Sequence, residues 1–178
     1  METRNFNVDT TQSSIEWTGK KVTGAHNGTI NISDGALTLT DGKLTGGKFT
    51  IDTTSIKILD VTDPATNAQF AGHLASEDFF GIEKYPSATL EITSVSNASN
   101  ATYHIAGNLT IKGISHPIEF DAAIEDIRNG ILQASGKLVI DRTKYGMRFR
   151  SGNFFKDLGD TLIYNDFTLN IQLTAKAA

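Results

Sequence analysis

Apolar and polar residues alternate with a period of two along most of this sequence, and that pattern restricts the fold more than any other feature. Between Thr102 and Lys112, one face carries Tyr103, Ile105, Gly107, Leu109 and Ile111. Successive side chains of a β-strand point to opposite faces, so this period indicates half-buried strands. Similar runs lie at 88–92, 118–124, 132–140 and 167–173.

Short pairs of Asn or Asp followed by Gly separate many of these runs and predict tight turns. Such pairs supply the positive φ angles that two-residue hairpins need. The pairs are Asn27-Gly28, Asp34-Gly35, Asp41-Gly42 and Asn129-Gly130. Asn27-Gly28 has a second interpretation, a bend within a strand. Near Gly46-Gly47 the apolar residues change from even to odd positions, which predicts a β-bulge at that pair.

One stretch, from Asn67 to Gly81, departs from the period of two. Phe70, Leu74 and Phe79 or Phe80 recur at the spacing of one helix face, which predicts a short helix. The residues from 76 to 80 are expected to begin a turn that leads back towards the next strand.

The number of expected strands raises the question of how the sheet protects its edges. About eight or more antiparallel strands with short turns can close into a barrel, and a two-sheet sandwich is the competing solution. Small residues on the expected inward faces favour a barrel with space inside; these are Gly107, Ala122, Ala134 and Gly136. We therefore predict an all-β fold, an antiparallel barrel, in one domain covering residues 1–178.

Composition argues against several classes of function. The net charge is −4 and the basic residues are scattered, which argues against a nucleic-acid partner. There is no cysteine, so thiolate chemistry is excluded. No apolar run reaches the ~18 residues of a transmembrane segment. The opening METRNFNVD lacks the apolar part of a signal peptide, so the sequence as it stands predicts the cytoplasm, and the periplasm if a leader has been removed.

Histidines are the first candidates for polar chemistry. The sequence contains His26, His73, His104 and His116. They lack the spacing of a metal-binding motif, so no metal is expected. His104 lies on the polar face of its strand, and His116 precedes a proline in an expected turn. His73 is expected to pin its own segment by hydrogen bonds.

Glu77 and Asp78 are adjacent carboxylates beside the expected helix, and acid-base chemistry is one interpretation of them. Adjacent residues rarely converge on one substrate, so capping and turn formation is the main interpretation. The sequence also lacks a nucleophile elbow, a phosphate-binding glycine loop and a dinucleotide fingerprint. No catalytic residue and no cofactor are therefore predicted.

Four segments together carry a resemblance to a known family. They are VDTTQSSIEWTGKKVTGAHNG (8–28), HLASEDFFGIEKYPSATLEITSV (73–95), GNLTIKGISHPIEFDA (107–122) and ASGKLVIDRTKYGM (134–147). In order and approximate spacing they resemble the YceI-like family of bacterial polyisoprenoid-binding proteins. The resemblance implies a lipocalin-like, eight-stranded antiparallel barrel with a short helix near its mouth.

The same resemblance implies a ligand. Members of the family are associated with polyprenyl compounds, isoprenoid quinone precursors or fatty-acid derivatives, and a homodimer would follow family habit. We therefore expect non-catalytic binding, storage or transport of a long-chain apolar lipid inside the barrel. Two alternatives stay open: an enzyme acting on a lipid head group through a carboxylate near the mouth, and a solidly packed structural or interaction barrel.

A second irregular segment, rich in aromatic residues, glycine and charge, runs from Tyr145 to Tyr164. Apolar residues on the inward faces and in these two irregular segments are the candidates for the lumen and mouth. They are Trp17, Phe49, Phe70, Leu74, Phe79, Phe80, Leu90, Ile92, Tyr103, Ile105, Phe120, Tyr145 and Met147. Filling of an ordinary core is the alternative for each of them. Arg148 and Arg150 lie beside the last of these residues. A solvated surface position is their main interpretation, and contact with a polar head group is the alternative.

Overall fold

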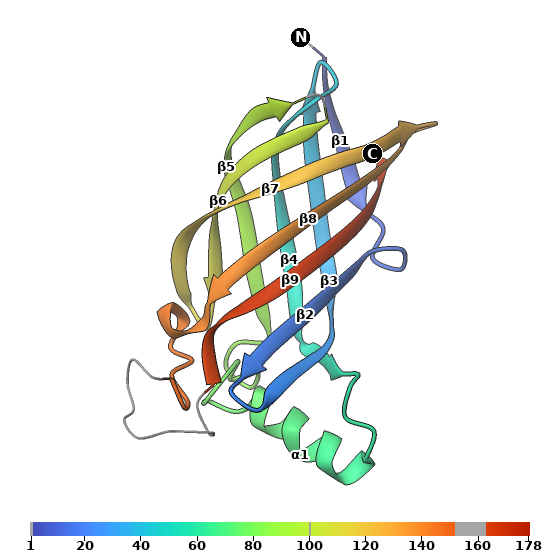
Figure 1. Cartoon of the computed structure of the whole chain (residues 1–178). Coiled ribbons are helices and arrows are strands. Elements are labelled where there is room, and N and C mark those ends of the chain that lie inside the picture. Colours follow the sequence, from blue (N-terminus) through green and yellow to red (C-terminus); the bar gives the residue numbers. More distant parts are fainter. Residues whose placement is uncertain (1, 100, 152–162) are drawn as a thin grey trace.

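The structure, a computed structural model, describes residues 2–99, 101–151 and 163–178. Within these residues the chain forms nine strands, one α-helix and one short 3-10 helix, η1 (Figure 1). In chain order they are β1 (Thr3–Val8), β2 (Ser14–Lys21), β3 (Gly24–Thr40), β4 (Lys43–Ile58), α1 (Pro64–Ala75), β5 (Ser87–Ser99), β6 (Thr102–Ile111), β7 (Ile114–Arg128), β8 (Ile131–Asp141), η1 (Arg142–Tyr145) and β9 (Ile163–Ala177).

Backbone pairing closes the strands into a barrel. The order in space is β3-β2-β9-β8-β7-β6-β5-β4, and β4 pairs with β3 again to complete the ring. All of these pairings are antiparallel. The predicted closed, eight-stranded antiparallel barrel is confirmed, because the ring has eight strand positions. Closure pairs β3 with β4 and so joins the two outer strands of the sheet to each other.

The nine strands fill eight ring positions because β1 and β2 share one of them. β2 pairs with the first part of β3 and with β9, whereas β1 pairs with the last part of β3 and the end of β9. The link between them is fixed to β9, where the Asp9 amide donates to the Thr174 carbonyl at 2.7 Å. Hydrogen bonds from the Thr11 side chain and from Lys176 hold the pKa of Asp9 well below its usual range.

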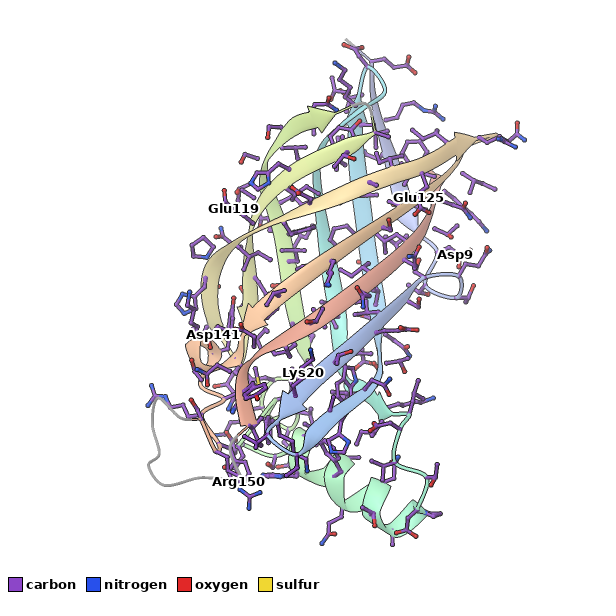
Figure 2. The ribbon with its side chains drawn as sticks, viewed as in Figure 1. Asp9, Lys20, Glu119, Glu125, Asp141 and Arg150 are labelled. Atoms are coloured by element: carbon purple, nitrogen blue, oxygen red, sulfur yellow. The ribbon has the colours of Figure 1, made fainter. Side chains whose placement is uncertain are left out.

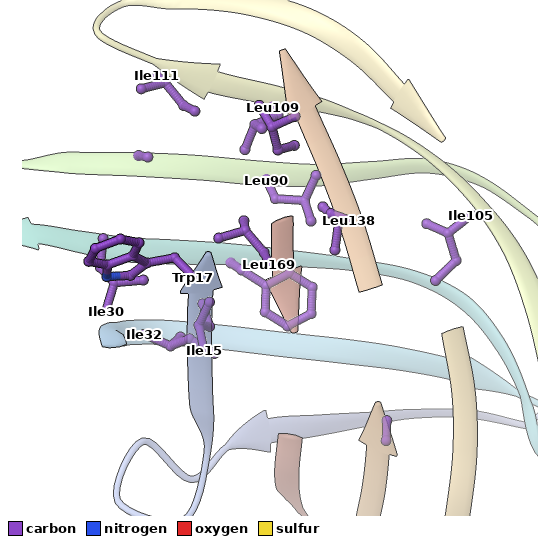
Figure 3. Packing of buried hydrophobic residues seen from close by; sticks show 14 of the residues in the cluster. Ile15, Trp17, Ile30, Ile32, Leu90, Ile105, Leu109, Ile111, Leu138 and Leu169 are labelled. Atoms are coloured by element: carbon purple, nitrogen blue, oxygen red, sulfur yellow. The ribbon is translucent and has the colours of Figure 1, made fainter. Parts of the chain in front are cut away.

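The alternating pattern of the sequence matches the two faces of the wall. Along β6, Tyr103, Ile105, Gly107, Leu109 and Ile111 are buried, and the residues that alternate with them are partly or fully exposed. Figure 3 shows Ile105, Leu109 and Ile111 with side chains from other strands inside the barrel. Burial of one side-chain face is what fixes the register of each strand.

Two of the expected hairpin turns are confirmed and one is wrong. Asp41 and Gly42 have φ angles of 52° and 79°, and Asn129 and Gly130 have 54° and 75°, as two-residue hairpins require. Asp34-Gly35 instead lies inside β3. A Cβ on Gly35 would come within 2.8 Å of the Phe49 ring, so close packing rather than a turn requires glycine there. A further hairpin at Lys112-Gly113, with φ angles of 55° and 71°, lacks the expected Asn or Asp.

Asn27-Gly28 adopts the second of its two interpretations, a position within β3. The indole Nε1 of Trp17 donates to the Lys57 carbonyl at 3.2 Å, directly beside Gly28. A Cβ on Gly28 would lie 1.7 Å from that carbonyl oxygen and 2.7 Å from the indole. The absence of a side chain at this position is therefore what allows β3, β4 and Trp17 to approach one another.

The expected bulge in β4 lies one residue earlier than predicted. Thr38 of β3 is opposite Gly46, and the next residue, Leu39, is opposite Leu44. Thr45 is thus the additional residue, and it restores Leu44 and Phe49 to the inner face. The change from even to odd apolar positions thus correctly indicated a bulge, but Gly46-Gly47 does not mark its position.

The predicted helix is present, although it begins and ends earlier than the pattern of phenylalanines suggests. Asp63 caps α1 by accepting a hydrogen bond from the Thr66 amide at 2.9 Å, and Pro64 occupies its first turn. The helix ends at Ala75, so Phe79 and Phe80 lie in the turn that follows. In the described part of the chain, no helix is long and apolar enough to span a bilayer.

The helix covers one end of the barrel, which we call the mouth, and both termini lie at the opposite end (Figure 1). Asn67 fixes α1 to the end of β4. Its side-chain amide donates to the carbonyls of Ile58 at 2.9 Å and Val61 at 3.0 Å.

On the outer wall, His104 of β6 lies beside two carboxylates of β7. Its Nδ1 is 2.9 Å from Asp121, and its Nε2 is 3.4 Å from Glu119. The hydrogen bond to Asp121, followed by that to Glu119, raises the pKa of His104 above its ordinary value of 6.5. The ion pairs thus favour the charged imidazole in the folded protein.

We expect Gly28→Ala to lower the free energy of unfolding by at least about 2 kcal/mol, because its methyl group would overlap the Lys57 carbonyl. The matched control is Gly46→Ala, whose added Cβ meets nothing within 4 Å. That change should leave stability unchanged or raise it by up to about 1 kcal/mol. Urea unfolding of the two variants measures the difference, and equal stabilities would contradict the packing argument.

A second prediction concerns pH. Because the pKa of His104 is raised on folding, its contribution to stability is fully present below pH 6.5 and is lost as pH rises through the folded pKa. NMR titration of the imidazole should show this raised pKa, and Asp121→Asn should lower it. Glu125→Gln, on the same strand, serves as the control and should leave the titration unchanged. A His104 pKa insensitive to Asp121→Asn would contradict the assignment.

Candidate ligand-binding site

The barrel contains a cavity of about 810 Å³ at its mouth end. Inward-facing residues of the strands form its wall, including Ile15 and Trp17 of β2 and Phe167 and Leu169 of β9. Figure 3 shows Trp17, Ile15 and Leu169 in the barrel interior. The lining is mainly apolar, and the volume lies within the range of small-molecule binding sites, ~300–1,000 Å³.

One face of α1 lies over this cavity and covers part of its opening. Thr66, Phe70, His73 and Leu74 line it, and their spacing of three and four residues places them on one side of the helix. Leu74 is buried. The helix therefore contributes to the binding site as well as covering it.

An aromatic cluster joins the helix to the segment after η1. The imidazole of His73 meets the ring of Phe79 edge-on at 5.0 Å and that of Phe149 at 4.5 Å. Phe79 and Phe149 also contact each other, with centroids 5.9 Å apart. His73 is held in place by Asp78, 3.0 Å from its Nε2, as its expected pinning role requires. Phe70 packs against His26 at 4.7 Å on the other side.

A second, smaller cavity of about 60 Å³ lies deeper in the barrel, and its lining is apolar. Leu37 and Leu44, which flank the β3–β4 hairpin, are among its walls. Ile15 and Ile51 line both cavities. These two side chains therefore form the boundary between the main chamber and the deeper one.

The structure divides the residues proposed from the sequence between these two cavities. The main cavity is lined by Trp17, Phe70, Leu74, Phe79, Phe80 and Met147. The deeper one is lined by Phe49, Leu90, Ile92, Tyr103, Ile105 and Phe120. In the described structure Tyr145 lines neither cavity. It is 1% exposed and packs edge-on against His116 at 5.3 Å. Contact of these residues with a ligand stays a prediction.

Arg142 is a cavity residue that the sequence pattern did not indicate. It begins η1, directly after β8, and its side chain is 4% exposed. It lines the main cavity beside Phe79, whose ring centroid lies 5.8 Å from the guanidinium carbon. A charged residue at the end of a strand is usually solvated, so its burial could not be recognised without the structure.

The rim of the cavity carries further charges. Lys20, Lys21, Arg150 and Asp166 contribute to its lining. Figure 2 shows Lys20 and Arg150 near the mouth, whereas Glu125 and Asp9 lie towards the other end. Arg150 also lies over the ring of Phe149, 4.9 Å from its centroid. Three of these four rim charges are positive, although the chain as a whole is negative.

The histidines outside the aromatic cluster form hydrogen bonds with neighbouring protein groups. His116 lies in β7 rather than in the expected turn, and its Nε2 is 2.9 Å from the Lys144 carbonyl. His26 bonds to Asp60 at 2.8 Å. Among the described residues, no group of three or more acidic or histidine side chains could hold a metal ion.

Glu77 and Asp78 face different partners. Glu77 lies 3.8 Å from Lys84, whereas Asp78 contacts His73. Neither carboxylate is among the described residues that line the main cavity. Asp166, at the exposed rim, is the carboxylate found in that lining.

Sequence comparison gives a family match over almost the whole chain. Residues 6–175 match the model of the YceI-like domain. A UPF0312 protein of Pseudomonas putida strain W619 is 30% identical over 95 residues, which cover 53% of this chain and 47% of that protein. This match spans about half the length of that relative. A UPF0312 protein of Photorhabdus laumondii is 28% identical over 152 residues, covering 82% of this chain and 71% of that protein.

Structural comparison gives the same fold. BcnA of Burkholderia cenocepacia superimposes with a TM-score of 0.75 at 23% identity, covering 95% of this chain and 99% of that one. A polyisoprenoid binding domain from Saccharophagus degradans gives 0.72 at 14% identity, with coverages of 97% and 98%. At these identities the likeness shows the fold alone.

Proposed function

The chain belongs to the YceI-like domain family, and we propose that its barrel binds a long-chain apolar lipid and stores or carries it without chemical change. The polyisoprenoid binding domain of Saccharophagus degradans, which shares the fold, supports this class of ligand. The ligand classes that fit the proposal are polyprenyl compounds, isoprenoid quinone precursors and fatty-acid derivatives.

The observation that carries the proposal is the main cavity itself. Its volume of about 810 Å³ is bordered by apolar strand residues and by the inner face of α1. Each methylene transferred from water to such a site contributes ~0.8 kcal/mol. For ligands of drug size the binding free energy falls to ~0.3 kcal/mol per heavy atom, which still permits tight binding of a long chain. The cavity also argues against a solidly packed structural barrel.

The lining favours binding over catalysis. Most of its residues are aliphatic or aromatic and offer shape rather than directed hydrogen bonds. Discrimination between chains of similar width should therefore be modest, because one methylene changes affinity by only ~1–3 kcal/mol. The deeper cavity beyond Ile15 and Ile51 extends the apolar space along the barrel and would receive the end of a long chain.

Lipid extraction from gently purified protein, followed by mass spectrometry, tests the proposal directly. We expect a long-chain lipid to be recovered in stoichiometric amount, or a delipidated sample to take up a polyprenyl quinone or a fatty amide. Repeated preparations that contain no lipid and take up neither compound would refute the proposed function.

A cavity-filling variant tests where the lipid lies. Gly19 lines the main cavity, and a Cβ there would meet nothing within 4 Å, so Gly19→Phe places a ring in the chamber without a backbone clash. Displacing two methylenes should weaken binding about tenfold. Lipid uptake monitored by native mass spectrometry gives the affinity.

The control for this variant is Gly46→Phe. Gly46 also leaves free space around an added Cβ, but it does not line either of the two interior cavities described above. Its uptake should equal that of the unmodified protein. Equal weakening by both variants would mean that the lipid is not held in the main cavity.

A further inference from the structure

Arg142 is a buried cation that lines an otherwise apolar cavity. Its Nε donates to the Tyr164 carbonyl at 3.1 Å, Nη1 to the Met147 carbonyl at 2.6 Å and Nη2 to the Ile163 carbonyl at 3.0 Å. A guanidinium has five N–H donors. These three bonds leave two donors in a site from which solvent is almost excluded, since the side chain is 4% exposed.

The charge of Arg142 lacks a bonded counter-charge in the described structure. The adjacent Asp141 directs its Oδ1 to Thr143, accepting from the amide at 3.0 Å and from the hydroxyl at 2.6 Å. None of the ion pairs found between described residues includes Arg142. Burial accordingly lowers the pKa of Arg142, and the charge of Asp141 only partly opposes that effect. A buried charge without a partner is costly to the folded state.

The described charges of the cavity lining favour an anion over a cation. Lys20, Lys21 and Arg150 line the same cavity as Arg142, and among the described residues Asp166, at the exposed rim, is the carboxylate of that lining. Like-signed charges around an apolar chamber raise the local concentration of ligands of opposite charge. The cavity therefore combines an apolar interior for a chain with cationic groups for a head group.

We propose that the lipid held in the barrel is an amphiphile with an anionic head group, a carboxylate or a phosphate, that pairs with Arg142 while its chain fills the cavity. This inference rests on the proposed lipid-binding function and specifies the class of ligand. Arginine suits the role because its planar fork binds carboxylate and phosphate oxygens in pairs.

A purely structural role for Arg142 is the competing explanation. In that case its three carbonyl bonds would only tie η1 to Met147 and to the start of β9. Such a tie would influence folding and the affinity for every chain alike. It would not distinguish an acid from a neutral lipid with the same chain.

The test uses the whole 178-residue chain and compares its affinities for neutral and anionic ligands of equal chain length. Palmitate, hexadecanol and palmitamide form one set, and geranylgeranyl phosphate and geranylgeraniol form the other. We expect each anionic ligand to bind ten- to hundredfold more tightly than its alcohol, the range typical of charge-assisted hydrogen bonds. The two sets show whether carboxylate or phosphate is preferred, and acetate and inorganic phosphate alone show whether the anion binds without a chain.

Variants assign the preference to a residue. Arg142→Gln should reduce the acid-to-alcohol affinity ratio towards one, and Arg142→Lys should restore part of it. Lys137→Gln, a charge change on β8 outside the main cavity, should keep the ratio of the unmodified protein. A ratio that persists in Arg142→Gln but disappears in the Lys20→Gln, Lys21→Gln double variant would overturn the assignment to Arg142.

If Arg142→Gln does not fold, the affinities of the unmodified protein still test the anionic head group. Equal affinities for acid and alcohol would refute the anionic head group while leaving lipid binding intact. Absence of binding by every chain in both sets would instead refute the proposed function. An affinity for the acid at least tenfold higher than for its alcohol supports both lipid binding and the anionic head group.

Discussion

Closure of the backbone ladder is the constraint on which the rest of this structure depends. Eight antiparallel strand positions are joined by backbone hydrogen bonds around a ring, so one face of each strand points to the lumen and the other to the outside. Because β1 and β2 share one position, β3 and β9 each have a partner both near the mouth and towards the far end of the barrel. The bulge at Thr45 and the close approach at Gly28 adjust two strands to that closed geometry.

The closed ring also explains why space remains inside. Eight strands enclose an interior that side chains can fill or that can hold one ligand. Towards the β3–β4 hairpin, Phe49, Leu37 and Tyr103 reduce that interior to about 60 Å³. At the mouth Phe70, Phe79 and Phe149 lie in the cover, on α1, in the turn after it and in the segment after η1, and a chamber of about 810 Å³ stays open beneath them. The position of the bulky side chains, rather than the size of the ring, therefore sets the shape of the cavity.

The sequence allowed the barrel to be predicted because period-two alternation is a local signal that burial of one face enforces. The predictions from the sequence were wrong at positions where contacts between distant segments determine the local structure. Asp34-Gly35 resembles a turn, but its glycine makes room for the Phe49 ring, which only the paired strand β4 brings near. The hairpin at Lys112-Gly113 was missed because lysine is not a typical residue at positive φ. Arg142 was missed because its environment is assembled from η1, β9 and the turn after α1.

The mouth differs from the wall in the kind of contact that holds it closed. Backbone ladders join the strands of the wall, whereas α1 and the turn after it are attached through side chains such as Asn67 and Lys112. Lys112, in the β6–β7 hairpin, donates to the Glu77 carbonyl at 2.6 Å, and the Asn67 side-chain amide donates to the carbonyl of Ile58 at the end of β4. Segments with few ladder bonds open at a lower free-energy cost than core strands. The α1 cover should therefore separate from the barrel at a lower free-energy cost than a paired strand of the wall, because side-chain contacts rather than backbone ladders hold it there.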